Sequence, residues 1–254
     1  MNYLLSDTDR TFTGETFSGD LYARAIHPDG KSYHTFRTAT VLVDGSGLVF
    51  EGCTFENTAG SGKEKGQAIA LYLDGDDITL QNCIIRGHQD TLFLAPLPIR
   101  EHEKDGFIGP KKDEPRTRRV FHIKNCVIEG SVDFVFGGAT AYFDDCTFIS
   151  NESGYVFAPS TPQDVKEGFV ARNCRFLRTG TVEDESVYIA RPWRRYGKVR
   201  LQNCYLDSHI SKVGFDDWGD ESRRSTVVFE EYGSYGPGSE GARRPSWVRH
   251  DLEG

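Results

Sequence analysis

The stretch Asn125–Phe136 reads NCVIEGSVDFVF, and a near copy, NCIIRGHQDTLF, stands upstream at Asn82–Phe93. In both copies an aspartate, Asp90 or Asp133, follows the cysteine by seven residues. Internal similarity at a fixed spacing is typical of repeat architectures, in which equivalent positions of neighbouring units lie side by side. We therefore expect the two aspartates to lie on adjacent units of a repeating fold.

The same phrase recurs through most of the chain. Apolar and polar residues tend to alternate before each cysteine, as in a half-buried strand, and a polar and then an apolar residue follow it. A related phrase without cysteine, STVVFEEYGSY, comes later. The gaps between successive cysteines are 30, 43, 20, 28 and 30 residues. The six cysteines are Cys53, Cys83, Cys126, Cys146, Cys174 and Cys204.

This period favours a solenoid. Strand phrases recur once per 20–30 residues and no helical stretch separates them, so the sequence predicts an all-β, right-handed, single-stranded parallel β-helix with long loops on one face. Stacked coils lie about 4.8 Å apart, which lines up equivalent side chains. The cysteines are then expected to point inward as free thiols, since cysteine packs as a small hydrophobe.

We expect residues 1–254 to form one β-helix domain. Two segments rich in Gly, Pro and charge, residues 14–35 and 94–118, interrupt the period and are predicted to be loops that leave the coil. The second inserts directly after the first aspartate unit, where a long loop is more often functional than decorative. Residues 237–254 are predicted to be an irregular tail.

Composition excludes several classes of function. The formal net charge of −8 argues against nucleic acid as a partner. No run of about 18 apolar residues exists, so no membrane span is expected. The cysteines form no CxxC pair, which disfavours zinc, and we expect no metal and no cofactor. The start, MNYLLSDTDR, is too short and acidic for a secretory signal, so the chain either stays in the cytoplasm or lost a leader.

Stacking of the two aspartate units predicts a chemical pair. Carboxylates about 4–7 Å apart cannot both ionise cheaply, so one pKa rises. Counting 13 residues back from the next cysteine places Arg191 on the same face as Asp133, two coils further on. Its guanidinium reaches Asp133 if the coil between offers small residues such as Ala158 and Ser160. Arginine then holds Asp133 ionised and leaves Asp90 as the proton carrier.

Two glutamines stand near this pair. Gln89 precedes the first aspartate directly, and Gln67 lies one coil earlier, before the apolar segment AIALYL. Neutral amide donors stabilise an oxyanion, which suits acyl transfer better than glycosidic cleavage. The alternatives are that the aspartates only bond their own turns and that the Arg–Asp pair only braces a sheet. His88 is a further candidate base, and Trp193 is either core or sugar platform.

The motifs together resemble a known family. From about Thr35 to Trp247 the chain is similar to pectin methylesterases, through GQAIAL (66–71), GHQDTLF (87–93), GSVDFVFG (130–137) and ARPW (190–193) in that order. The resemblance implies a parallel β-helix that removes methyl esters from galacturonate units of pectin. It further implies Asp133 as nucleophile, Asp90 as general acid and base, Gln67 and Gln89 as oxyanion donors, Arg191 as the residue that orients the nucleophile, and substrate contacts from Thr35, Phe136 and Trp193.

Some features depart from that family. The usual Gly-x-Tyr-x-Glu strand and N-terminal capping helix are not visible, so the first coil is expected to have an open edge that invites self-association. The 94–118 insertion resembles bacterial members. Other readings stay open: a polygalacturonase, a pectate lyase with calcium at Asp76–Asp77 or Asp144–Asp145, or a non-catalytic β-helix that binds polysaccharide. The expected partner is methylesterified homogalacturonan or its oligomers.

Overall fold

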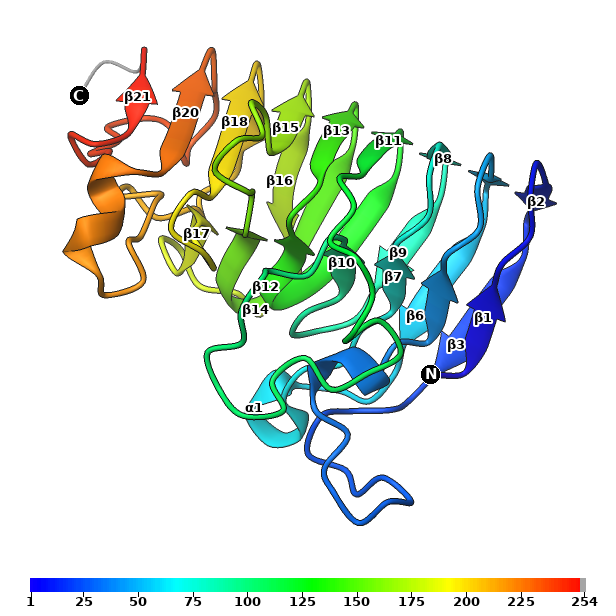
Figure 1. Ribbon diagram of the computed structural model, residues 1–254. Coiled ribbons are helices and arrows are strands. Elements are labelled where there is room, and N and C mark those ends of the chain that lie inside the picture. The colour runs from blue at the N-terminus through cyan, green and yellow to red at the C-terminus, as the bar shows by residue number, and fades with distance from the viewer. Residues whose placement is uncertain (252–254) are drawn as a thin grey trace.

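The computed structural model describes residues 1–251 as a stack of coils, and each regular coil contributes three short strands. One coil contains β4 (Val41–Val43), β5 (Val49–Glu51) and β6 (Thr54–Asn57). Every strand pair in the two sheets is parallel, and Figure 1 shows the coils following one another from the N-terminal to the C-terminal end. The predicted all-β parallel β-helix is confirmed.

The strands form two sheets. The 12-stranded sheet contains β4 and β6 with β1 (Tyr3–Leu5), β3 (Thr16–Gly19), β7 (Leu71–Leu73), β9 (Ile84–Arg86), β10 (Leu92–Leu94), β12 (Val127–Gly137), β14 (Thr147–Pro159), β16 (Arg175–Arg178), β17 (Val187–Ala190) and β19 (Tyr205–Leu206). The 9-stranded sheet contains β5 with β2 (Thr11–Thr13), β8 (Ile78–Gln81), β11 (Val120–Lys124), β13 (Thr140–Asp144), β15 (Phe169–Arg172), β18 (Lys198–Gln202), β20 (Val228–Tyr232) and β21 (Arg249–His250). Helical turns are confined to η1 (Thr35–Arg37), α1 (Gly62–Lys65) and η2 (Glu221–Ser225) within residues 1–251.

The repeated phrase around each cysteine folds as a sharp corner between the two sheets. The residue before the cysteine has a left-handed backbone, which glycine, asparagine and aspartate adopt most readily. These residues are Gly52, Asn82, Asn125, Asp145, Asn173 and Asn203, with φ between 50° and 62°. The cysteines that follow are buried and unbridged, and the backbone N–H of Cys83 lies 3.3 Å from the Cys126 sulfur. The predicted core of free thiols is confirmed.

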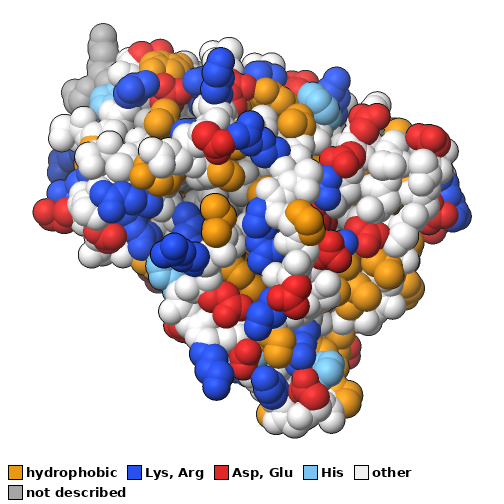
Figure 2. All heavy atoms as spheres, viewed as in Figure 1, with side chains coloured by type: hydrophobic (Ala, Val, Ile, Leu, Met, Phe, Trp, Pro, Cys, Tyr) orange, Lys and Arg blue, Asp and Glu red, His pale blue; other side chains and the backbone are white. Residues whose placement is uncertain are grey.

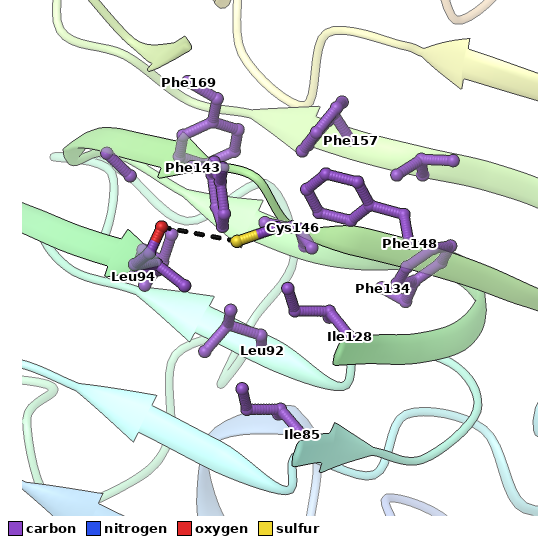
Figure 3. Packing of buried hydrophobic residues seen from close by; sticks show 14 of the residues in the cluster. Ile85, Leu92, Leu94, Ile128, Phe134, Phe143, Cys146, Phe148, Phe157 and Phe169 are labelled. Atoms are coloured by element: carbon purple, nitrogen blue, oxygen red, sulfur yellow. Dashed lines mark hydrogen bonds between the residues drawn. The ribbon is translucent and has the colours of Figure 1, made fainter. Parts of the chain in front are cut away.

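Inside the coils, apolar side chains stack from one turn to the next. Phe148 packs edge to face against Phe157 and face to face against Phe176, with ring centroids 5.0 Å apart in both pairs. Figure 3 shows Phe148, Phe157 and Cys146 converging with Ile128 on the same interior. Such ladders of like residues bury apolar surface along the whole axis, which is the main favourable term in folding.

The strands on the loop-covered face are apolar on both sides. Val41 and Val43 face the interior, while Leu42 points outward, because successive side chains of a strand alternate. The outward ladder Leu42, Tyr72, Phe93, Phe136 and Ala158 is also buried, because connecting segments cover it. Figure 1 shows these connections and α1 on one side of the stack.

Two predicted irregular segments contain strands. Residues 16–19 form β3 inside the segment expected to leave the coil at residue 14, and β21 lies inside the expected tail 237–254. Both strands pair in sheets because their residues continue the coil register. Between β10 and β11 the chain forms turns and bends without a strand. Within residues 1–251 no helix is long and apolar enough to cross a membrane.

Candidate active site

A cavity of about 410 Å³ opens on the loop-covered face, and all eight predicted site residues line it. Successive coils contribute them in order: Gln67 precedes β7, Gln89 and Asp90 precede β10, Asp133 lies in β12, and Arg191 follows β17. Thr35, Phe136 and Trp193 complete the predicted set. The structure therefore brings together residues spread over most of the chain.

The two aspartates occupy equivalent positions of adjacent coils. Ile84 pairs with Val127 before them and Leu92 pairs with Val135 after them, so the 43-residue offset of the cysteines is kept. The backbone N–H of Asp90 donates to the Val132 carbonyl at 3.0 Å, one residue before Asp133. Both aspartates have positive φ, 62° and 50°, a strained conformation that often marks functional positions. The predicted stacking of the pair is confirmed.

Arg191 makes a two-point ion pair with Asp133. Its Nε lies 2.8 Å from Oδ1 and its Nη2 2.7 Å from Oδ2, the fork geometry that fixes a carboxylate most firmly. The guanidinium is held between the rings of Tyr155 and Trp218, at 3.9 and 3.8 Å from their centroids. Aromatic faces on both sides restrict its orientation.

Arg191 contacts Asp133 from two coils further on, as predicted, but the two residues are not at equivalent positions of their coils. Strand register places Arg191 beside Ala158, which itself pairs with Phe136, three residues after Asp133. The register of β12 against β14 shifts between Gly130 and Val135, so counting back from the cysteines fails there. The arginine instead reaches back along the strand direction. Ala158 lines the cavity, whereas Ser160 is not among the lining residues.

Burial raises the pKa of both carboxyl groups. The pKa of Asp90 lies well above its ordinary value, because the group is desolvated and because Asp133 carries a like charge beside it. Burial also raises the pKa of Asp133, but the hydrogen bonds and charge of Arg191 oppose that increase. Asp90 is thus the group better able to hold a proton, and Asp133 the one better able to carry charge.

Gln89 is fixed by close packing. The backbone N–H of Ala68 donates to the Gln89 carbonyl at 3.1 Å, and Gly62 at the start of α1 sits so near that an added Cβ would lie 2.6 Å from the Gln89 side chain. Gln67 lines the same cavity from the preceding coil. His88 turns elsewhere: its Nδ1 lies 3.1 Å from Glu152, and it does not line the cavity.

An aromatic wall borders the pair. The rings of Phe136 and Trp193 meet edge to face at 5.7 Å, and Phe36 lies beside Trp193 at 6.4 Å. Phe107, from the insertion between β10 and β11, packs on both Phe36 and Trp193. Trp193 is partly buried and therefore belongs to the cavity wall rather than to the interior of the coils.

Part of the cavity lining was not predicted from the sequence. The insertion contributes His102, Glu103, Gly106 and Phe107, and the C-terminal part contributes Arg194, Trp218 and Arg223. The insertion follows the first aspartate unit directly, and this position indicated that its residues could reach the site. No repeat or motif marked the second group.

A known protein family matches most of the chain. The pectinesterase family matches residues 17–101 and 115–252. The chain belongs to the pectinesterase family. It is 34% identical over 220 residues to Pectinesterase 31 of Arabidopsis thaliana, covering 86% of this chain and 61% of that protein. It is 30% identical over 246 residues to Pectinesterase QRT1 of the same plant, covering 92% and 58%.

Solved pectin methylesterases share the fold. The deglycosylated pectin methylesterase from Aspergillus niger is 26% identical, with a TM-score of 0.70 over 97% of this chain and 79% of its own. Pectin methylesterase from carrot is 22% identical, with a TM-score of 0.76 over 100% and 80%, and that likeness concerns the fold alone. The chain thus spans about three fifths of the length of the two plant relatives named above.

The acidic pairs considered for calcium do not line the cavity. Asp76 bonds Arg119 at 2.5 Å, and Asp144 faces Arg172 at 3.4 Å. Within residues 1–251, no three His, Cys, Asp or Glu side chains gather in a metal-binding arrangement.

Proposed function

We propose that this chain hydrolyses methyl esters of galacturonate units in pectin, releasing methanol and leaving a free acid on the polymer. The observation that carries the proposal is the buried carboxyl pair, with Arg191 forked onto Asp133 alone. One carboxyl group held for charge beside one held for a proton is the arrangement that nucleophilic ester cleavage needs.

In the proposed reaction Asp133 attacks the ester carbonyl carbon. The amides of Gln67 and Gln89 donate to the oxygen as it gains negative charge. As the tetrahedral intermediate collapses, the bond between the acyl carbon and the methoxy oxygen breaks. Asp90 gives its proton to that oxygen, and methanol departs. Asp90 then takes a proton from water, whose oxygen attacks the acyl carbon and releases Asp133. In this scheme side chains provide the nucleophile, the proton donor and acceptor, and the hydrogen bonds to the oxyanion.

The wall suits a sugar chain. Trp193 offers an apolar face for a pyranose ring, Phe136 packs against it from the buried side, and Thr35 offers a hydroxyl at the same rim. We therefore propose methylesterified homogalacturonan or its oligomers as substrate. A pectin methylesterase of the same fold has been solved in complex with a hexasaccharide, which supports an oligosaccharide as the occupant. Kinship with bacterial members and self-association through the first coil stay predictions.

The test is an assay of highly methylated pectin for methanol and for new chain ends in parallel. We expect methanol release with no new reducing or unsaturated ends, and no loss of rate on addition of a calcium chelator. New chain ends without methanol would favour a polygalacturonase or lyase. Binding of pectin without any turnover would favour a non-catalytic β-helix.

A further inference from the structure

Glu152 lies outside the cavity lining, on an irregular part of β14. β14 pairs with β12 at Ser150 and again at Tyr155, whereas β12 advances over the same stretch only from Gly130 to Val132. The extra residues of β14 form a bulge, which bends a strand and turns its side chains in new directions. The Glu152 side chain, 20% exposed, thereby contacts the segments that precede β7 and β10.

The two carboxylate oxygens of Glu152 have different partners. Its Oε1 lies 3.1 Å from Nδ1 of His88, and its Oε2 accepts a hydrogen bond of 3.0 Å from the hydroxyl of Ser61. Ser61 is the N-cap of α1, where its oxygen also accepts from the Lys63 N–H at 3.3 Å. His88 directly precedes Gln89. Glu152 therefore joins the start of α1 to the turn that carries Gln89.

The backbone of this turn is also fixed from the neighbouring strands. The Ser131 N–H donates to the His88 carbonyl at 2.9 Å, and the side-chain amide of Asn151 donates to the Gly87 carbonyl at 2.9 Å. These bonds leave the side-chain torsions of Gln89 free. A long side chain keeps one orientation only where its surroundings hold it, because ordering it costs conformational entropy.

The start of α1 packs against that side chain. Gly62 follows Ser61 and lies so close to Gln89 that an added Cβ would stand 2.6 Å from the Gln89 Cβ and Oε1. α1 has only 4 residues, so contacts with the rest of the protein hold it in place. Gln67, beyond the other end of α1, is held separately, because its carbonyl accepts from the Ala23 N–H at 2.8 Å. A loosened start of α1 would therefore release the Gln89 amide.

A third contact of Glu152 is weaker than these two. Lys63 Nζ lies 3.6 Å from the Glu152 carboxylate, and the Lys63 side chain is 82% exposed. Acidic and basic side chains are interspersed over the face shown in Figure 2, and exposed pairs of this kind contribute little. The bonds of Glu152 to Ser61 and His88 are therefore the ones that fasten α1.

We propose that Glu152 is a positioning residue for the oxyanion donor Gln89 and acts through the start of α1. The inference rests on the proposed function, in which the Gln89 amide donates to the oxygen that gains negative charge. A donor is most effective when it is already aimed at the place where charge develops. Because the oxyanion forms only during the reaction, loss of this positioning lowers kcat and leaves KM unchanged.

The experiment measures methanol release from a methylated oligogalacturonide in a double-mutant cycle. Glu152→Ala should lower kcat about tenfold, less than the roughly 10²–10³-fold cost of a whole oxyanion donor, with KM within about twofold. In a Gln89→Ala background the same change should lower kcat less than about twofold, because the amide that it positions is absent. In a Gln67→Ala background the loss of about tenfold should remain. Equal losses of kcat in both backgrounds would overturn the proposal, since general damage to the structure acts on every background alike.

Two variants at the same contacts serve as controls. Glu152→Gln keeps the length of the side chain and can bond both Ser61 and His88, so its kcat should stay within about threefold of the parent. Lys63→Ala removes only the exposed partner and should change kcat less than about twofold. A Glu152→Gln variant as impaired as Glu152→Ala would count against positioning through these bonds.

Hydrogen exchange keeps this test separate from the proposed function, because it needs no turnover. The Gly66 N–H donates within α1 at 2.9 Å and the Ala68 N–H donates to the Gln89 carbonyl at 3.1 Å, so both report how firmly α1 is held against the turn. Glu152→Ala should speed their exchange about tenfold relative to the parent and to Lys63→Ala. Unchanged exchange would contradict the proposal whether or not the parent releases methanol. Faster exchange in a protein whose parent releases no methanol would instead overturn the proposed function alone.

Discussion

Asp90 and Asp133 combine two unfavourable features, a buried carboxyl group and a left-handed backbone. Each feature costs stability, and both coincide in adjacent coils beside the cavity. A protein keeps such a combination where function requires it, because sites built for reactivity are rarely optimal for folding. The pair should therefore show a measurable conflict between stability and activity.

Asp90→Asn is expected to stabilise the protein at neutral pH. A carboxyl whose pKa is raised in the folded state binds its proton more tightly than in the unfolded chain, so stability is lost as pH rises from about 3.9 through the raised value. Asparagine carries no charge, so the variant avoids that loss of stability, which is about 1.4 kcal/mol for each unit by which the pKa of Asp90 is raised. Thermal unfolding at pH 7 and pH 3 tests this, with exposed Asp113→Asn as control. A variant no more stable than its parent at pH 7 would count against the raised pKa.

Arg191→Gln should move the acidic limb of the activity profile to higher pH. The arginine's bonds oppose the rise in the pKa of Asp133, so without them the nucleophile ionises only at higher pH. The variant should also lose activity at its new optimum, because the fork no longer orients the carboxylate. Methanol release measured from pH 4 to pH 9 gives both effects. An unshifted limb would mean that Arg191 braces the sheet without tuning Asp133.

The sequence predicted this pair because the 43-residue offset between Cys83 and Cys126 also relates Asp90 to Asp133 in the strand pairing. It predicted the Arg191 contact through an offset that the structure does not keep, since β14 shifts its register against β12. Irregularities of this kind depend on how a whole strand packs, and a single repeat phrase does not record them. Arg194 and Arg223 lie outside every repeat, so spacing alone could not place them in the wall.

The corner before each cysteine explains the repeat. The left-handed residue turns the chain from one sheet into the other, and the cysteine that follows fills the interior. The sequence revealed the cysteines, while the need for Gly, Asn or Asp before them became clear from the backbone. The connection 95–119 contains no strand and no such corner, and several of its residues line the cavity, so the repeat does not predict its conformation.

Asn173 tests the corner away from the cavity, at an exposed position with φ of 52°. Asn173→Gly should leave the free energy of unfolding within about 0.5 kcal/mol, whereas Asn173→Val should cost about 1–2 kcal/mol, because a branched side chain is strained in a left-handed backbone. Urea unfolding measures both variants. Equal stability of the two would show that the conformation is not what selects asparagine.

A fully buried ion pair ties the C-terminal segment to the coils. Arg244 contacts Glu231 of β20 at 2.7 Å, and neither side chain is exposed. The same guanidinium donates to the carbonyls of Ser211 and Lys212 at 2.9 Å, and Gly214 packs against it. The last part of the chain is thereby fastened to the coil that carries Trp218, which lies next to the coil that carries Arg191.

Arg244→Met should cost about 3–5 kcal/mol, because it leaves Glu231 buried without its partner. Replacing both residues, as Arg244→Met with Glu231→Leu, should recover most of that loss, since a buried ion pair is worth little against apolar packing. Urea unfolding of the parent and both variants measures the difference. A single variant as stable as the parent would contradict the view that this pair fastens the C-terminal segment.

We propose that Asp133 is the nucleophile and Asp90 the general acid and base. The most direct test is methanol release from one methylated oligogalacturonide by the parent, Asp133→Asn and Asp90→Asn. Asp90→Asn should keep a trace of activity, about 10²–10⁴-fold below the parent, as expected for loss of a general acid–base group. Asp133→Asn should fall below that trace, because no acyl intermediate can form. Near-parental methanol release by Asp133→Asn would contradict the account.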